Sequence, residues 1–171
     1  DLHYPLRRQR QMCIRDSFIA AYSGIAGPAY TISTACSSSA KVFASARALL
    51  EMELCVAVFV GGSDSLCEFV LNGFASLEVL SAEVSNPMSR NRNGINLGEG
   101  ACVFLMERAP DGVQLRGVGE SCDAHHMSSP EPHGYGAQSA MQNALKNSEM
   151  DPNEIQYLNL HGTGTLSLIH I

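Results

Sequence analysis

The chain has 171 residues, of which 45% are hydrophobic, and its formal net charge at pH 7 is -6. This length fits one domain, and the apolar fraction is enough to build a core. An acidic chain without a basic stripe argues against nucleic acid as the main partner. No apolar run approaches the about 20 residues needed to cross a bilayer, so no membrane partner is expected.

The cysteines predict a reducing compartment. No two have CxxC spacing, and several lie in apolar runs, where a free cysteine behaves as a small hydrophobe. We therefore expect a cytoplasmic protein with neither a disulfide nor a metal site. The cysteines are Cys13, Cys36, Cys55, Cys67, Cys102 and Cys122.

The two ends of the chain differ in sequence pattern from its middle. Residues 12–17 (MCIRDS) and 166–171 (LSLIHI) can be encoded by DNA strings that are reverse complements of each other. Those strings resemble the transposon-end adapter of sequencing libraries. The basic stretch at 6–11 is also typical of a transit peptide or a nuclear-import patch. We expect residues 1–17 and 166–171 to be non-native, adapter-derived segments.

In the first half, residues 29–34 are strand-like, and the pattern becomes helical from residue 35. A continuous apolar strand is predicted over 55–60, and a second helix over about 64–80. The first helix should bury one apolar face, formed by Val42, Phe43, Ala46, Leu49 and Leu50.

In the second half, residues 85–96 are rich in Asn, Arg, Ser and Pro and predict an irregular loop. Strands are predicted over 101–107 and 113–118, joined by a hairpin turn at 109–112 (APDG). Residues 136–150 should form a helix, and 155–160 a strand leading into His161. Strands that alternate with helices predict an α/β layered domain.

Cys36 lies in residues 34–39 (TACSSS), where the predicted strand ends and the helix begins. The unpaired N–H groups and the dipole of a helix N-terminus favour an anion. A cysteine there should have a lowered pKa and thiolate character. The competing interpretation is a buried, inert cysteine, which we expect for Cys55, Cys67 and Cys102. The junction alone leaves both interpretations open for Cys36.

A second motif, residues 161–165 (HGTGT), follows the last predicted strand. Ligands of open α/β sheets bind at the carboxyl ends of strands. The glycines permit tight turns, and the threonines offer hydroxyl groups to a ligand. A lone histidine at such a place is more often structural than catalytic.

Together the two motifs resemble the β-ketoacyl synthase family, in which a TACSS-like context holds the nucleophile and HGTGT carries an active-site histidine. The resemblance extends from residue 24 to residue 165. It includes residues 27–28 (GP), 60–62 (VGG), 89–94 (SRNRNG) and 98–100 (GEG).

The resemblance implies roles for particular residues. Cys36 would accept an acyl group from an acyl-carrier thioester, and His161 would assist decarboxylation of the malonyl carrier. Thr163 and Thr165 match threonines that hydrogen-bond the phosphopantetheine arm. Ile95 stands where the family often has an aromatic lining the acyl pocket. The implied partner is acyl carrier protein, with no cofactor beyond the phosphopantetheine that it carries and no metal.

The resemblance also implies a thiolase-like α/β fold of two related halves, each with a mixed five-stranded sheet, here incomplete at both ends. We expect residues 18–110 to be the later part of the N-terminal half and residues 111–165 the start of the C-terminal half. The full-length protein should be a homodimer. The family's lysine and second catalytic histidine lie downstream of HGTGT, and His170 is no substitute because it lies in the adapter-derived tail. The chain as written should therefore be inactive.

Several alternatives compete with a ketosynthase. A thiolase-like, CoA-dependent acyltransferase shares the fold and the cysteine, and a non-catalytic carrier-protein-binding fragment is also open. Chain-length-factor-like proteins lack the cysteine. A hydrolase is disfavoured because residues 61–65 (GGSDS) lack the second glycine of a nucleophile elbow. A metal-binding domain would use His125, His126 and His133 as ligands, but no pattern of cysteines or carboxylates completes such a site. Saturated fatty acids, aryl polyenes and polyketides all fit as products.

Overall fold

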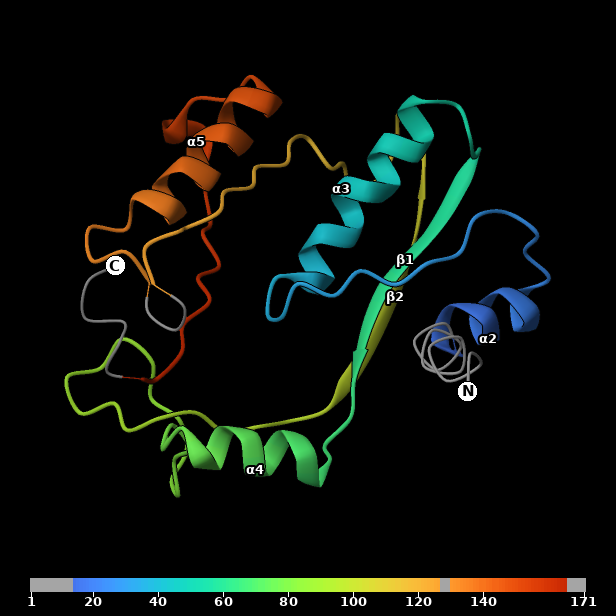
Figure 1. The fold of residues 1–171 in the computed structure, drawn as a ribbon. Helices are drawn as coiled ribbons and strands as arrows, with labels where there is room; N and C mark the ends of the chain where they lie inside the picture. The colour runs from blue at the N-terminus through green and yellow to red at the C-terminus, as the bar shows by residue number, and fades with distance from the viewer. Residues whose placement is uncertain (1–13, 127–129, 166–171) are drawn as a thin grey trace. The chain divides into compact units, whose positions relative to one another are not determined.

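The computed structural model describes residues 14–126 and 130–165, with side chains from residue 18 onward. The segments expected to be adapter-derived lie outside the described residues, except for 14–17, which begin the first helix. The chain divides into two compact units, residues 1–62 with 102–110 and residues 63–101 with 111–171. The elements, shown in Figure 1, are α2 (Ile14–Ser23), α3 (Ser38–Glu51), β1 (Ala57–Asp64), α4 (Glu68–Ser76), β2 (Gly100–Glu107), α5 (Tyr135–Ser148) and the 3-10 helix η1 (Pro152–Glu154).

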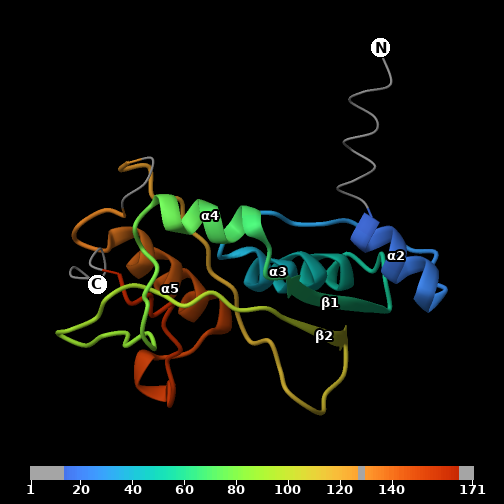
Figure 2. The ribbon, with the colours of Figure 1, turned by 90° about the horizontal axis from the view of Figure 1, so that it is seen from below.

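In the first unit, α3 packs along a sheet made of β1 and β2. Figures 1 and 2 both show the helix lying beside the two strands. Ala46 and Leu50 on α3 and Val60 on β1 are buried, with exposed fractions of 2%, 3% and 5%. The ring of Phe43 on α3 meets that of Phe104 on β2 edge to face, with centroids 5.5 Å apart. These contacts confirm the predicted apolar face of the helix.

Two adjacent glycines in β1 allow this close packing. A Cβ atom on Gly61 would collide with the backbone carbonyl of Cys102 on β2, and one on Gly62 would collide with the side chain of Ser39 on α3. A strand glycine often marks such a close approach of another chain segment. The strand predicted over 55–60 therefore extends through both glycines, because β1 ends at Asp64.

In the second unit, residues 117–119 pass against α5. The N–H of Val118 donates to Asn147 Oδ1 over 3.0 Å, and the backbones of Gly117 and Gly119 approach the helix closely. The strand predicted over 113–118 is therefore wrong, because the N–H of Val118 bonds to a helix side chain instead of a neighbouring strand. The hairpin predicted at 109–112 does not form either, and β2 pairs with β1.

Other expectations also need correction. Residues 29–34 and 155–160 form no strand; the nearest feature is an isolated bridge between Thr34 and Cys36. The described residues contribute two strands, β1 and β2, to the incomplete sheet expected for this part of the fold. The helix predicted over 64–80 is shorter, at Glu68–Ser76. The predictions for α3, β1, β2 and α5 are confirmed apart from their exact ends.

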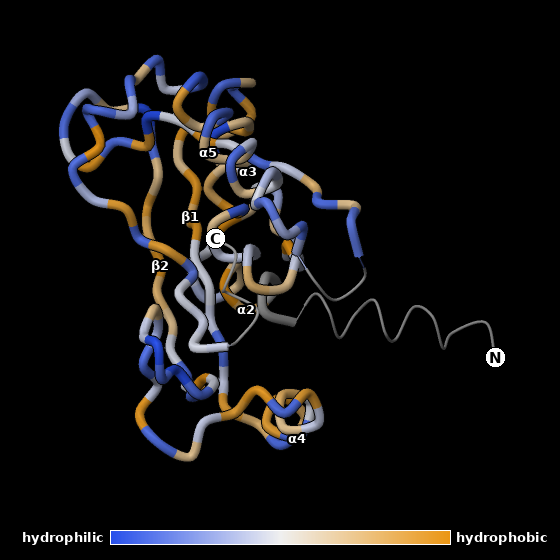
Figure 3. Tube along the Cα trace, turned by 90° about the vertical axis from the view of Figure 1, so that its left-hand side faces the viewer, coloured by the Kyte–Doolittle hydropathy of each residue, from blue (hydrophilic) through white to orange (hydrophobic). Residues whose placement is uncertain are grey.

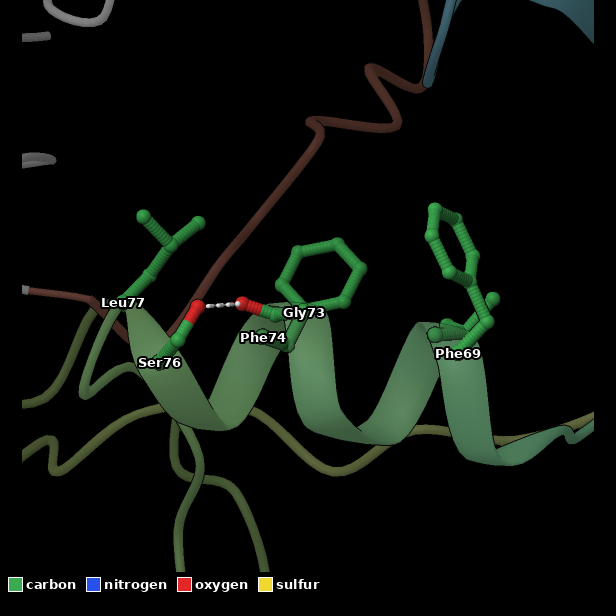
Figure 4. A pocket seen from close by; sticks show the side chains of 6 residues that line it. Phe69, Gly73, Phe74, Ser76 and Leu77 are labelled. Carbon is green, nitrogen blue, oxygen red and sulfur yellow. Dashed lines mark hydrogen bonds between the residues drawn. The ribbon is translucent and has the colours of Figure 1, made fainter.

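The α4 helix carries an exposed apolar face. Figure 3 shows hydrophobic residues along this helix, and the exposed fractions of Phe69 and Leu77 are 86% and 67%. Figure 4 shows Phe69, Phe74 and Leu77 projecting around Gly73, where they line a shallow hollow. No helix among the described residues is long and apolar enough to cross a membrane.

Candidate active site

Cys36 lies at a sharp elbow directly before α3. The helix begins at Ser38, and Ser37 is its N-cap residue, so Cys36 precedes the cap by one position. Ala35, the residue before the cysteine, has a φ of 52°, in the left-handed region that residues with a Cβ rarely occupy. The cysteine is exposed. The elbow thus presents a thiol to its surroundings at the amino end of a 14-residue helix.

The two serines that follow Cys36 make hydrogen bonds to the residues before it, and only Ser38 reaches the carbonyl of Ala35. Ser38 Oγ accepts a hydrogen bond from the N–H of Thr34 over 2.8 Å and donates to the carbonyl of Ala35 over 2.7 Å. Ser37 Oγ donates to the carbonyl oxygen of Thr34 over 2.8 Å and lies 2.9 Å from Thr34 Oγ1. These roles were not predicted from the sequence, although the density of Ser and Thr in TACSSS was a visible signal.

The HGTGT segment belongs to the second unit, and its residues differ in exposure. His161 is exposed, Thr163 and Thr165 are half-buried, and Gly164 is buried. The two threonine hydroxyls lie 3.0 Å apart and hydrogen-bond each other. Gly162 has a φ of 58°, which glycine adopts at no steric cost. The segment therefore shows one exposed imidazole and a pair of coupled hydroxyls.

A loop from the same unit holds this segment in place. The N–H of Gly94 donates to the carbonyl of Gly164 over 2.8 Å. Arg92 donates from Nε to the carbonyl of Thr165 over 3.0 Å, and from Nη1 to that of Ser89 over 2.9 Å. The irregular loop predicted over 85–96 is thus confirmed, and it has a fixed hydrogen-bonded structure.

Hydrogen bonds of Asn96 also join the two ends of that loop. Asn96 accepts the N–H of Ser85 on Oδ1 over 2.6 Å, and its Nδ2 donates to the carbonyls of Ser81 and Glu83. Half-buried Ile95 exchanges backbone hydrogen bonds with the 79–81 segment and forms an isolated bridge with Leu80. The roles of Arg92 and Asn96 were not anticipated from the sequence, because their partners lie on other segments.

The candidate residues are divided between the two units. Cys36 belongs to the first, whereas His161, Thr163, Thr165 and Ile95 belong to the second. Within the second unit, the structure joins the HGTGT segment to the backbone of the loop that carries Ile95, through the hydrogen bond between Gly94 and Gly164.

The other cysteines differ from their expected burial. All five that the structure describes are free. Cys55 is half-buried, but Cys67 and Cys102 are exposed, so the prediction that these two are buried is wrong. Cys102 is exposed because β2 is open to solvent along nearly its whole length.

The histidines considered for a metal lie beside a loop organised by two carboxylates. The N–H groups of Glu131 and His125 donate to Asp123, and these hydrogen bonds lower the pKa of that carboxyl. Partial desolvation raises the pKa of Glu131, but N–H donation from Tyr135 and His133 outweighs it, so the pKa is lowered. Among the described residues, no three His, Cys, Asp or Glu side chains gather in a metal-binding cluster. The two carboxylates accept hydrogen bonds from backbone N–H groups of the loop.

The hydrolase alternative finds no support in the local geometry. Ser63 lies inside β1, which continues to Asp64. A nucleophile elbow places its serine at the turn between a strand and a helix. Residues 61–65 therefore lack the backbone shape as well as the sequence of that motif.

Comparisons with known proteins agree with the two motifs. The family model Beta-ketoacyl synthase, N-terminal domain, matches residues 4–112, and Beta-ketoacyl synthase, C-terminal domain, matches residues 113–168. The chain is 32% identical over 166 residues to 3-oxoacyl-[acyl-carrier-protein] synthase I, chloroplastic, of Arabidopsis thaliana, which covers 88% of this chain and 35% of that protein. It is 33% identical over 151 residues to Nodulation protein E of Rhizobium meliloti, covering 83% and 37%.

A solved structure gives the same answer for the fold. The ketosynthase ApeO of Xenorhabdus doucetiae, in complex with its chain length factor ApeC, superposes with a TM-score of 0.87 at 48% identity, covering 90% of this chain and 38% of that one. The chain thus spans little more than a third of the length of these relatives. The expected thiolase-like α/β fold is confirmed. The chain belongs to the β-ketoacyl synthase family.

Proposed function

We propose that the full-length protein containing this chain is a 3-oxoacyl-[acyl-carrier-protein] synthase that uses Cys36 as its nucleophile. The observation that carries this is the exposed thiol on a braced elbow before α3, in a member of a family of condensing enzymes. The thiolate attacks the carbonyl of an acyl-carrier thioester. The C–S bond to the carrier breaks, and the carrier leaves as a thiolate while the acyl group stays on Cys36.

The second half of the reaction forms a carbon–carbon bond. The malonyl carrier loses CO₂, and the resulting enolate attacks the acyl-Cys carbonyl. The bond to Cys36 sulfur breaks, which gives a β-ketoacyl carrier and restores the thiolate. His161, exposed on the HGTGT segment, would hydrogen-bond the enolate oxygen. The backbone N–H of Cys36 would stabilise the oxyanion on the acyl carbonyl.

The threonine pair and Ile95 would hold the substrate. Thr163 and Thr165 hydroxyls, 3.0 Å apart, suit two polar atoms of a phosphopantetheine arm. Half-buried Ile95 would line the acyl pocket. No resident cofactor is part of this proposal, because the acyl groups arrive on the carrier's own phosphopantetheine.

Two kinds of protein partner are proposed: a carrier that brings the substrates and a second subunit. Acyl carrier protein would deliver both substrates, and the enzyme would work as a homodimer or as a pair with a chain length factor. The solved relative at 48% identity is a ketosynthase in complex with its chain length factor, which supports the second form. The five cysteines that the structure describes are free, which supports a reducing compartment such as the cytoplasm.

Mass spectrometry of the full-length protein tests the proposal. Incubation with an acyl carrier should add one acyl group at Cys36, and Cys36→Ala should abolish it. His161→Ala should still acylate but lose condensation with the malonyl carrier. Acyl-CoA replacing the carrier with equal efficiency would instead indicate a thiolase-like enzyme. Carrier binding without acylation would indicate a non-catalytic role, and acyl transfer that survives Cys36→Ala would overturn the assignment.

A further inference from the structure

The elbow at Cys36 contains a conformation that needs support. Ala35 has a φ of 52°, and a residue with a Cβ is disfavoured in this left-handed conformation because its Cβ comes too close to the following carbonyl oxygen. Strained backbone of this kind persists only when its surroundings hold it. The residues that hold Ala35 therefore also fix the direction in which the next side chain, Cys36, leaves the chain.

Ser38 makes hydrogen bonds on both sides of Ala35. Its Oγ accepts from the N–H of Thr34, the residue before, and donates to the carbonyl of Ala35, on the peptide that leads to the cysteine. The backbone N–H of Ser38 also donates to this carbonyl, over 3.1 Å. A serine hydroxyl has one donor hydrogen, so this bond uses all of its donor capacity.

Ser38 is also well anchored. It is the first residue of α3, whose later turns place Ala46 and Leu50 in the core of the first unit. The serine side chain thus connects the strained elbow to a packed helix. Ser37 differs, because both contacts of its Oγ go to Thr34 and neither reaches the carbonyl that precedes Cys36.

We infer that Ser38 is a positioning residue for the nucleophile: its hydroxyl bridges Thr34 and Ala35 and so fixes the direction of the Cys36 thiol. This inference rests on the proposed role of Cys36 as acyl acceptor. Loss of the hydroxyl leaves the N–H of Thr34 without this acceptor and the Ala35 carbonyl with one donor fewer. The elbow then samples other conformations, and the thiol spends less time in the reactive one.

The test compares Ser38→Ala, Ser38→Thr and Ser37→Ala in the full-length protein. Ser38→Ala should lower the acylation rate constant of Cys36 by about 10- to 100-fold, because small misplacements of reacting groups have effects of this size. The KM for the acyl carrier and the melting temperature should change little. Ser38→Thr keeps the hydroxyl and should restore most of the rate, and Ser37→Ala should stay within about 3-fold of the parent.

Alkylation of Cys36 by iodoacetamide across pH separates this inference from the proposed function. If the carrier never acylates Cys36, the proposed function fails, but Ser38→Ala should still change the rate–pH profile of alkylation relative to Ser37→Ala. Equal alkylation profiles in these two variants would overturn the inference. So would a loss of acylation by Ser38→Ala that Ser38→Thr does not reverse.

Discussion

Replacing Gly164 with alanine would place a methyl group against the carbonyl oxygen of Gly94, far inside van der Waals contact. The opposing atom belongs to the backbone, so no side-chain rotation can relieve the clash. The same change would push a Cβ to 2.9 Å from Ser85 Oγ. The two segments must separate, and the 2.8 Å hydrogen bond from the Gly94 N–H to the Gly164 carbonyl must lengthen or break.

The expected cost of this substitution follows from these contacts. Overpacking costs about 1–3 kcal/mol, and a lost hydrogen bond adds about 0.5–1.5 kcal/mol. Loss of glycine's freedom in the unfolded chain returns about 0.4–1 kcal/mol. The net local destabilisation is therefore about 0.5–4 kcal/mol, which corresponds to roughly 2- to 1,000-fold faster exchange of the Gly94 amide hydrogen through local opening.

Hydrogen exchange in the full-length protein measures this effect, with Gly98→Ala as the matched control. Gly98 has no atom within 4 Å of a built Cβ, and its φ is outside the left-handed region. Exchange over residues 79–96 should rise in Gly164→Ala and stay near the parent in Gly98→Ala. Equal exchange in the two variants would refute the close approach of the Gly94 and Gly164 backbones.

Three further outcomes are expected. Gly61→Ala should lower the unfolding free energy by about 2–3 kcal/mol, because the added methyl group meets the backbone of β2. Gly62→Ala should lower it by about 1 kcal/mol, because the methyl group meets a serine side chain of α3 that can rotate. Denaturant titration would measure both values, and a larger loss in Gly62→Ala would contradict this reasoning. Arg92→Met removes donors to two backbone carbonyls, so the KM for both carrier substrates should rise several-fold in steady-state kinetics while kcat changes little. Asp123 and Glu131 have lowered pKa values, so their contribution to loop stability is complete above the ordinary values of 3.8 and 4.5 and is lost as the pH falls below them. Carboxyl titration by NMR should give both midpoints below those values, and midpoints at or above them would contradict the hydrogen-bonding argument.

Local patterns were enough to predict part of the fold and the residues of the candidate site. The apolar spacing of residues 42–50 predicted α3 with its buried Ala46 and Leu50, because helix hydrogen bonds are internal to the segment. The TACSSS and HGTGT strings identified Cys36 and His161, and their family is now shown by comparison.

Only the tertiary structure decided which segments meet. Strands were predicted over 29–34, 113–118 and 155–160 from composition, but a strand needs a partner, and the N–H of Val118 found Asn147 on α5 instead. Likewise, no local pattern shows that Gly94 bonds to Gly164, a residue 70 positions later in the numbering. The sequence by itself identified the candidate chemical groups and the segments that form α3 and α5. Contacts between distant residues determined the position of the HGTGT segment, because such contacts depend on how the chain packs and not on the residues adjacent in sequence.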